Sequence, residues 1–151
     1  MTDPLRKQAE PMNDPAIRAQ IADILARMNQ NLDAEDYEAY ISVWTEDAIY
    51  DPHLSPATTG VDAIKEFLRR NNEAGFITGK RHSISNLTLD RLGNNVLASF
   101  YLSVFERVEA PRLIATAFIT DEFALIDGAW KIVRHVTRID PGMTKAMKPN
   151  Q

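Results

Sequence analysis

Apolar residues recur at helical spacing in the first part of the chain and alternate with polar residues in the last part. Between Asp14 and Asp33 the apolar positions repeat every three or four residues, which predicts one amphipathic helix with a single buried stripe. Asp14 supplies a cap at its start, and Pro15 suits the first helical position. This helix is the longest that the sequence predicts.

Shorter elements follow this helix. Residues 37–44 repeat the amphipathic pattern and predict a second helix, and 45–47 have the composition of a turn. A short strand is expected at 48–52, where Pro52 ends it. Residues 53–60 contain proline, threonine and glycine and predict a loop. A third helix is expected from Val61 to about residue 72.

The pattern then changes to four long segments with the alternation of β-strands, at residues 81–92, 96–108, 113–126 and 130–139. Asp127-Gly128 is the strongest hairpin signal in the chain, and Gly93-Asn94-Asn95 has the composition of another hairpin turn. Helices first and antiparallel strands afterwards predict an α+β fold, with the helices on one face of a curved sheet.

Length and composition limit the class of protein. The 151 residues suffice for one domain, expected at 14–140, with a flexible N-terminal arm at 1–13 and a C-terminal tail at 141–151. The net charge of -4 argues against nucleic-acid or anionic-membrane partners. No apolar run is long enough to span a membrane, and there is no cysteine. A soluble cytoplasmic protein is expected.

One strand combines polar and apolar residues on the same face. In the segment 81–92, alternation places His82, Ile84, Asn86 and Thr88 on one side. An apolar surface with a few polar groups is typical of the wall of a small-molecule pocket. The alternatives are a histidine hydrogen-bonded inside the core and an edge residue in water.

Three segments together resemble a known superfamily. They are residues 31–37 with 44–50, residues 81–86, and residues 127–135. In their order and spacing the chain resembles the SnoaL-like, nuclear-transport-factor-2-like superfamily, over nearly the whole span 14–140. The resemblance implies a cystatin-like α+β fold, a conical barrel in which a curved antiparallel sheet wraps around N-terminal helices and encloses a cavity.

The motifs are most similar to the scytalone dehydratase and hexachlorocyclohexane dehydrochlorinase group. That group pairs an aspartate after the first helix with a histidine on a strand, and Asp33 and His82 stand in those positions. By resemblance, Asp33 receives an N–H of His82, and the other ring nitrogen faces substrate. An imidazole, with an ordinary pKa of about 6.5, suits proton abstraction from carbon at neutral pH.

The resemblance therefore implies a cofactor-independent lyase or isomerase, similar to a dehydratase or polyketide cyclase, that acts on a hydrophobic small molecule. Further polar groups on the expected cavity wall are candidates for substrate binding: Tyr37, Tyr50, Asn86, Tyr101 and His135. Tyr101 lies near the place of a second histidine in scytalone dehydratase. His135 stands where relatives often carry an arginine, which removes a permanent cation and can provide a second titratable group.

Structural roles compete with these assignments. Asp33 can be a helix-end acid, Tyr37 a core residue, and Tyr50 a strand aromatic. No metal is expected, since His53, His82 and His135 match no standard ligand spacing.

A second class of function stays open. The chain can be a non-catalytic ligand-binding protein, or an analogue of the small subunit of an aromatic-ring-hydroxylating dioxygenase. Under either reading a homodimer or homotrimer is expected, because the outer face of such a sheet is often apolar. The candidate interface residues are Leu87, Leu89, Leu97 and Phe105.

Overall fold

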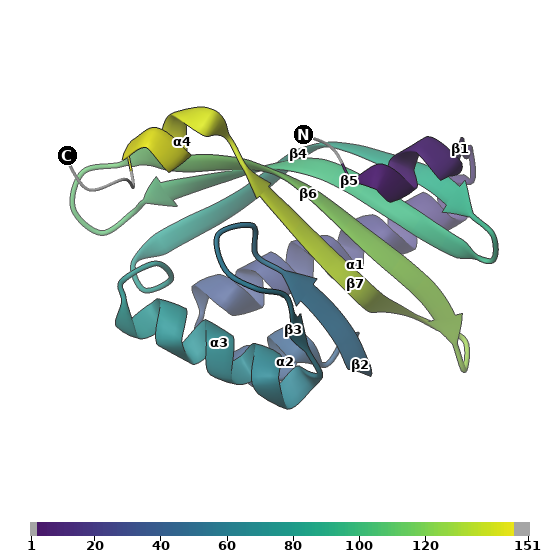
Figure 1. The fold of residues 1–151 in the computed structure, drawn as a ribbon, viewed down its shortest axis with the longest axis horizontal. Coiled ribbons are helices and arrows are strands. Elements are labelled where there is room, and N and C mark those ends of the chain that lie inside the picture. Colours follow the sequence, from purple (N-terminus) through teal and green to yellow (C-terminus); the bar gives the residue numbers. More distant parts are fainter. Residues whose placement is uncertain (1–2, 147–151) are drawn as a thin grey trace.

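A curved sheet arches over three helices in the computed structural model, which describes residues 3–146 (Figure 1). Residues 147–151 of the expected tail lie outside the described residues. In chain order the elements are η1 (Pro4–Gln8), β1 (Glu10–Pro11), α1 (Pro15–Asp33), α2 (Tyr37–Ile41), β2 (Trp44–Asp51), β3 (Thr58–Thr59), α3 (Val61–Glu73), β4 (Lys80–Leu92), β5 (Asn95–Glu106), β6 (Arg112–Ile126), β7 (Ala129–Ile139) and α4 (Pro141–Ala146).

The seven strands form one sheet in the order β1-β4-β5-β6-β7-β2-β3. The long strands β4 to β7 are successive antiparallel neighbours, as expected from their connecting turns. The sheet is curved but not closed, and its pairings are antiparallel as expected, except that β2 runs parallel to β7. The α+β class is confirmed.

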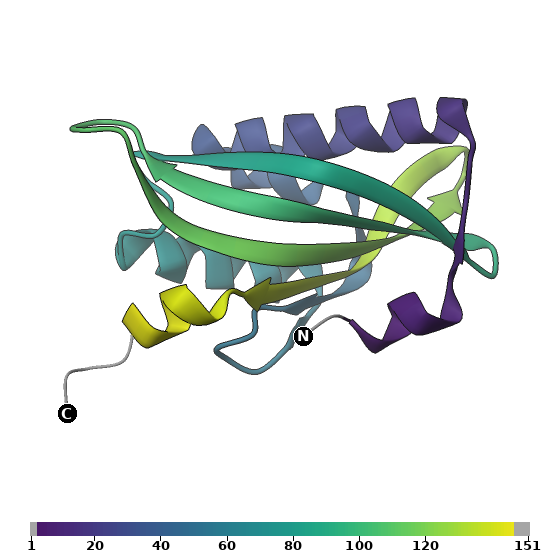
Figure 2. The same ribbon diagram turned by 90° about the horizontal axis from the view of Figure 1, so that it is seen from above.

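The first helix has the predicted bounds. The carboxylate of Asp14 accepts hydrogen bonds from the backbone N–H groups of Ala16 and Ile17, both at 3.1 Å. Figure 2 shows α1 running along the length of the long strands. Its predicted apolar stripe supplies four buried core residues, Ile21, Leu25, Met28 and Leu32. These side chains join the core between the helices and the sheet.

The segment after α1 departs from its sequence pattern. The second helix ends at Ile41, and residues 44–47, predicted as helix end and turn, belong to strand β2. Trp44 pairs with Ile132 of β7, and the backbone N–H of Ile132 donates to the carbonyl of Val43 at 2.8 Å. These hydrogen bonds come from a strand almost ninety residues away, which no local pattern can show.

The N-terminal segment is ordered against the sheet where a loose arm was expected. Strand β1 pairs with β4, and η1 lies against the outer face. Asp3 accepts a hydrogen bond from Arg134 at 2.6 Å, and the guanidinium of Arg6 lies over the ring of Phe118 at 5.1 Å. Leu97, on this outer face, is fully buried.

Two of the expected interface leucines are therefore unavailable on the protomer surface. Leu97 has no exposed area, and Leu89 belongs to the core inside the sheet. At the other terminus, part of the expected tail forms α4, beside β6. None of the helices within residues 3–146 has the length and apolar character needed to cross a membrane.

Candidate active site

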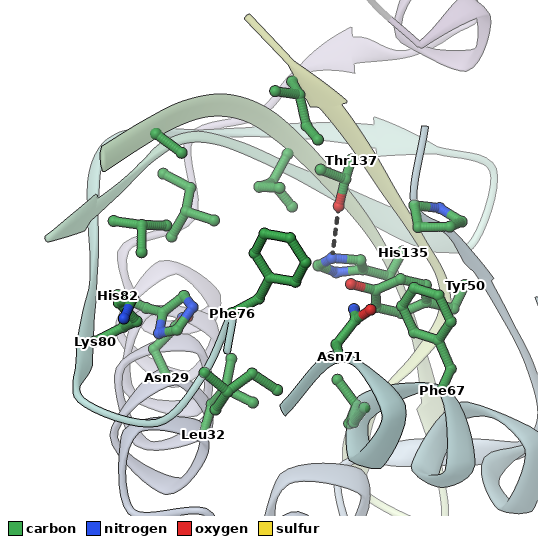
Figure 3. A pocket seen from close by; sticks show the side chains of 18 of the residues that line it. Asn29, Leu32, Tyr50, Phe67, Asn71, Phe76, Lys80, His82, His135 and Thr137 are labelled. Atoms are coloured by element: carbon green, nitrogen blue, oxygen red, sulfur yellow. Dashed lines mark hydrogen bonds between the residues drawn. The ribbon is translucent and has the colours of Figure 1, made fainter. Parts of the chain in front are cut away.

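A cavity of about 390 Å³ lies between the inner face of the sheet and the helices. Most of its wall is apolar, with side chains from α1, α3, the long strands and α4. Phe76 lines the cavity although half of its surface is exposed, which places it at the mouth. Two of the cavity's polar residues are histidines, His82 and His135, on opposite sides of Phe76 (Figure 3).

The last residue of α1 meets the third residue of β4 at one end of the cavity. Nδ1 of His82 lies 2.7 Å from Oδ1 of Asp33, and both side chains are 8% exposed. The backbone N–H of His82 also donates to Oδ1, at 3.1 Å. Because a carboxylate only accepts hydrogen bonds, Nδ1 carries a proton and Nε2 is left as the basic nitrogen.

Nε2 of His82 makes no hydrogen bond to any residue within 3–146, and the ring lines the cavity. The guanidinium of Arg81, on the exposed side of the strand, approaches the other oxygen of Asp33 at 3.8 Å. A carboxylate that holds one ring nitrogen can steady the imidazolium formed when the other takes a proton. This arrangement suits a general base in an apolar setting.

Asn86 does not lie on the cavity wall, contrary to the prediction. The register of β4 against β5 shifts between Ser85 and Thr88, so that Asn86 and Leu87 together lie opposite Phe100. Asn86 has a φ of 56°, a left-handed conformation that asparagine tolerates better than most residues. This β-bulge reverses the alternation, and Asn86 points to solvent.

The other end of the cavity holds a second histidine–aspartate pair. Nδ1 of His135, on β7, lies 2.5 Å from Oδ1 of Asp121, its register partner on β6. Asp121 is completely buried, and its Oδ2 has no hydrogen-bond partner among residues 3–146. Nε2 of His135 lies 3.2 Å from Oγ1 of Thr137, as the dashed line in Figure 3 shows.

Aromatic rings hold His135 in place. Tyr50 stacks on it with ring centroids 4.9 Å apart, and Trp44 contacts it at 5.3 Å. Burial raises the pKa of Tyr50 to about 12, with a smaller contribution in the same direction from the charge of Asp121. The phenol of Tyr50 therefore stays protonated at neutral pH and remains a hydrogen-bond donor.

Two further predicted wall residues lie elsewhere. Tyr101 is half exposed on the outer face of the sheet, where its ring contacts Phe118. It alternates with Phe100 and Leu102, which face the core. Tyr37 does not line this cavity but a polar groove between α2 and α3. Of the seven predicted site residues, the structure thus brings Asp33 and His82 together at one end and Tyr50 and His135 at the other.

Several residues of the candidate site were not predicted. Asp121 carries a signal in the sequence, because alternation puts it on the same face as Ile119 and Phe123, where a charged residue is unusual. Thr137 follows His135 at the same spacing. Met143 of α4 lines the cavity too, although its segment was expected to be a tail. No group of three or more potential metal ligands occurs in the described part of the chain.

Comparison with protein families identifies the domain. The model of the SnoaL-like domain matches residues 15–136, which is most of the chain. The protein belongs to the SnoaL-like domain family. A search of curated proteins found no match.

Solved structures share this SnoaL-like fold. A protein of unknown function with a cystatin-like fold from Nostoc punctiforme is 24% identical, with a TM-score of 0.78 over 86% of this chain and 96% of that one. Aln2 from a Streptomyces species is 19% identical, with a TM-score of 0.78 over 89% and 99%. A protein from Catenulispora acidiphila, solved in complex with S-DNPA, is 22% identical, with a TM-score of 0.78 over 87% and 99%.

Proposed function

We propose that this SnoaL-like protein is a small lyase or isomerase that removes a proton from carbon of a hydrophobic molecule without a cofactor. His82 is the base, and Asp33 orients it and balances the charge of the imidazolium. The observation that carries the proposal is the 2.7 Å contact between Asp33 and His82 at the wall of an apolar cavity.

The surroundings of the pair support a catalytic role. Nε2 of His82 has no hydrogen-bond partner among residues 3–146 and is therefore left for a molecule in the cavity. Burial of the pair strengthens its electrostatic interaction with a developing charge. The ligand held by the Catenulispora acidiphila relative is consistent with a small molecule in this fold.

A ketone probe tests the base without knowledge of the natural substrate. 2-Tetralone is an apolar bicyclic ketone with an acidic C–H beside its carbonyl group. Exchange of this hydrogen in D2O, followed by proton NMR, measures proton abstraction directly. We expect the wild-type protein to accelerate the exchange, His82→Ala to remove the acceleration, and Asp33→Asn to lower it about 100-fold, the usual range for a general base.

His53→Gln is the matched control, because it removes an exposed histidine that does not line the cavity. Exchange that is equally fast in His82→Ala and the wild-type protein would contradict the proposed base. A protein that binds 2-tetralone, shown by ligand-observed NMR, but never accelerates its exchange would instead fit the ligand-binding alternative.

A further inference from the structure

The cavity contains a second group that can transfer protons. His135 and Asp121 have the same arrangement as His82 and Asp33, with the carboxylate at Nδ1 and Nε2 toward the cavity wall. Asp121 is fully buried, and His135 is its only hydrogen-bond partner among the described side chains. A carboxylate so placed lets the imidazole give up or take a proton at Nε2 with its charge balanced.

The position of Nε2 distinguishes this group from an ordinary core histidine. Among the described residues its hydrogen-bond partner is the hydroxyl of Thr137 at 3.2 Å, and Thr137 itself lines the cavity. A hydroxyl can donate or accept, so Thr137 accommodates either protonation state of His135. The rings of Tyr50 and Trp44 hold the imidazole plane in place.

The two histidines are well separated on the sheet. His82 pairs with Val104 of β5, whereas Asp121, opposite His135, pairs with Ala98, six residues away on the same strand. Figure 3 shows the two rings on opposite sides of Phe76. They therefore cannot act on neighbouring atoms of one ligand.

We propose that His135, positioned by Asp121, is a second catalytic residue that exchanges a proton with an oxygen at the far end of the substrate. This deepens the proposed function and rests on it. The substrate class that fits is an elongated, fused-ring ketone in which conjugation connects the acidic carbon to a carbonyl oxygen across a ring.

In the proposed step His82 takes one proton from the substrate and His135 gives one to it. Nε2 of His82 takes the proton from carbon as the C–H bond breaks. The electron pair moves through the conjugated system to the distal carbonyl oxygen, which takes the proton from Nε2 of protonated His135 and forms an O–H bond. The product is the enol, His82 ends protonated and His135 neutral, and exchange with water restores both.

Two probes separate the second histidine from the first. In anthrone the acidic C–H lies across the central ring from the carbonyl oxygen, whereas in 2-tetralone the two are adjacent. We expect His135→Gln to lower the kcat of hydrogen exchange in anthrone, measured in D2O without oxygen, about 100-fold. In this variant the ratio of the anthrone rate to the 2-tetralone rate should fall by about tenfold or more, because the carbonyl oxygen of 2-tetralone lies beside its acidic carbon and away from His135.

Asp121→Asn tests the positioning role. It should lower kcat for anthrone by more than about tenfold with little change in KM, since the ligand contacts His135 and not Asp121. A merely structural role would lower the rates with both probes alike. His53→Gln again serves as the matched histidine control.

The outcomes tell the two proposals apart. If His82→Ala abolishes exchange in both probes while His135→Gln changes neither, the second site is refuted and the proposed function stands. If His82→Ala changes neither, the proposed function fails.

A measurement on the wild-type protein tests the second site even if the variants do not fold. Acridone cannot enolise, and it carries an N–H across the central ring from its carbonyl oxygen. With 15N-labelled histidine, bound acridone should shift the ring nitrogen signals of both His82 and His135 but not those of His53. A shift at His82 without one at His135 would overturn the second site.

Discussion

The two histidine–aspartate pairs of the cavity are built in different ways. Asp33 and His82 join the end of a helix to a strand almost fifty residues later, and the exposed Arg81 lies near the carboxylate. Asp121 and His135 are register partners on adjacent strands and lie among aromatic rings. We call the surroundings of these pairs the His82 end and the His135 end.

The two carboxylates differ in their burial and in the number of their interaction partners. Asp33 has backbone and guanidinium neighbours besides the imidazole, and 8% of its side chain is exposed. Asp121 is fully buried, and among the described side chains only His135 hydrogen-bonds to it. A buried pair that loses one partner leaves an uncompensated group, so the His135 end should be the more sensitive part of the fold.

The largest expected effect tests this comparison directly. Asp121→Ala leaves His135 buried without its partner and should lower the free energy of unfolding by about 3–5 kcal/mol. Asp33→Ala should cost about 1–3 kcal/mol, the range for a lost partially buried hydrogen bond. Urea unfolding midpoints at pH 7 measure both. Equal losses in the two variants would show that the two ends are energetically alike.

Alkaline pH should also lower the stability of the protein through a residue at the His135 end. The pKa of Tyr50 is raised to about 12 mainly by burial, so unfolding lets this phenol ionise at its ordinary pKa, near 10. Its share of stability is present below pH 10 and lost as pH rises from about 10 to 12, by about 2 kcal/mol. Tyr50→Phe should reduce this loss in urea titrations at pH 8 and pH 11.

Tyr101→Phe is the matched control for this measurement, because it removes an exposed phenol from the outer face. Tyr40, also buried, has a raised pKa for the same main reason, so part of the alkaline loss should persist in Tyr50→Phe. An unchanged pH profile in Tyr50→Phe would argue that Tyr50 ionises freely in the folded protein.

A smaller effect is expected on the bulged strand that carries His82. Asn86→Ala places a residue without a compensating side-chain polar group at a φ of 56° and should destabilise the fold by about 1 kcal/mol. Asn86→Gly should cost little, since glycine adopts this conformation freely. Thermal unfolding followed by circular dichroism can rank the two. Ser85→Ala, at the exposed neighbouring position, is the control, and a ranking with alanine above glycine would contradict the bulge.

The smallest effect concerns an ion pair between β2 and β7. The hydrogen bond from Arg138 lowers the pKa of Asp51. The stability from this pair is present above the ordinary carboxyl pKa of about 4 and is lost as pH falls through the lower pKa of the folded state. In Asp51→Asn the difference between the free energies of unfolding at pH 7 and pH 3 should shrink, by no more than about 1 kcal/mol for a partly exposed pair.

Arg138→Gln should shrink the same difference, because it removes the other partner. If the loss of stability between pH 7 and pH 3 is undiminished in both variants, other carboxylates are its cause.

The candidate site shows which positions the alternation along a strand predicts correctly and which it does not. Alternation placed His82 on the inner face correctly, and the family resemblance joined it to Asp33. The same alternation failed at Asn86, because one extra residue in the strand reverses every position beyond it. The apolar spacing carries a trace of this shift, since the residues after Ile84 that enter the core are Leu87 and Leu89.

Other features depended on contacts between distant segments. Trp44 ends a helical pattern but belongs to a strand, because β7 supplies its hydrogen-bonding partner. The N-terminal segment reads as a loose arm, yet β4 and Arg134 order it. No local propensity contains these partners.

The amino-acid sequence by itself determined the longer elements, because helical and alternating periodicities reflect which side of each segment is removed from water. It also determined the four long strands and their tight turns. Only the tertiary structure decided which polar groups share the cavity. Asp121 contacts His135 because the two are register partners on adjacent strands. Asn86 points outward because of the bulge in β4, and Tyr101 because its position in β5 faces the outer side of the sheet. These depend on how separate segments pair, which is a property of the folded chain as a whole.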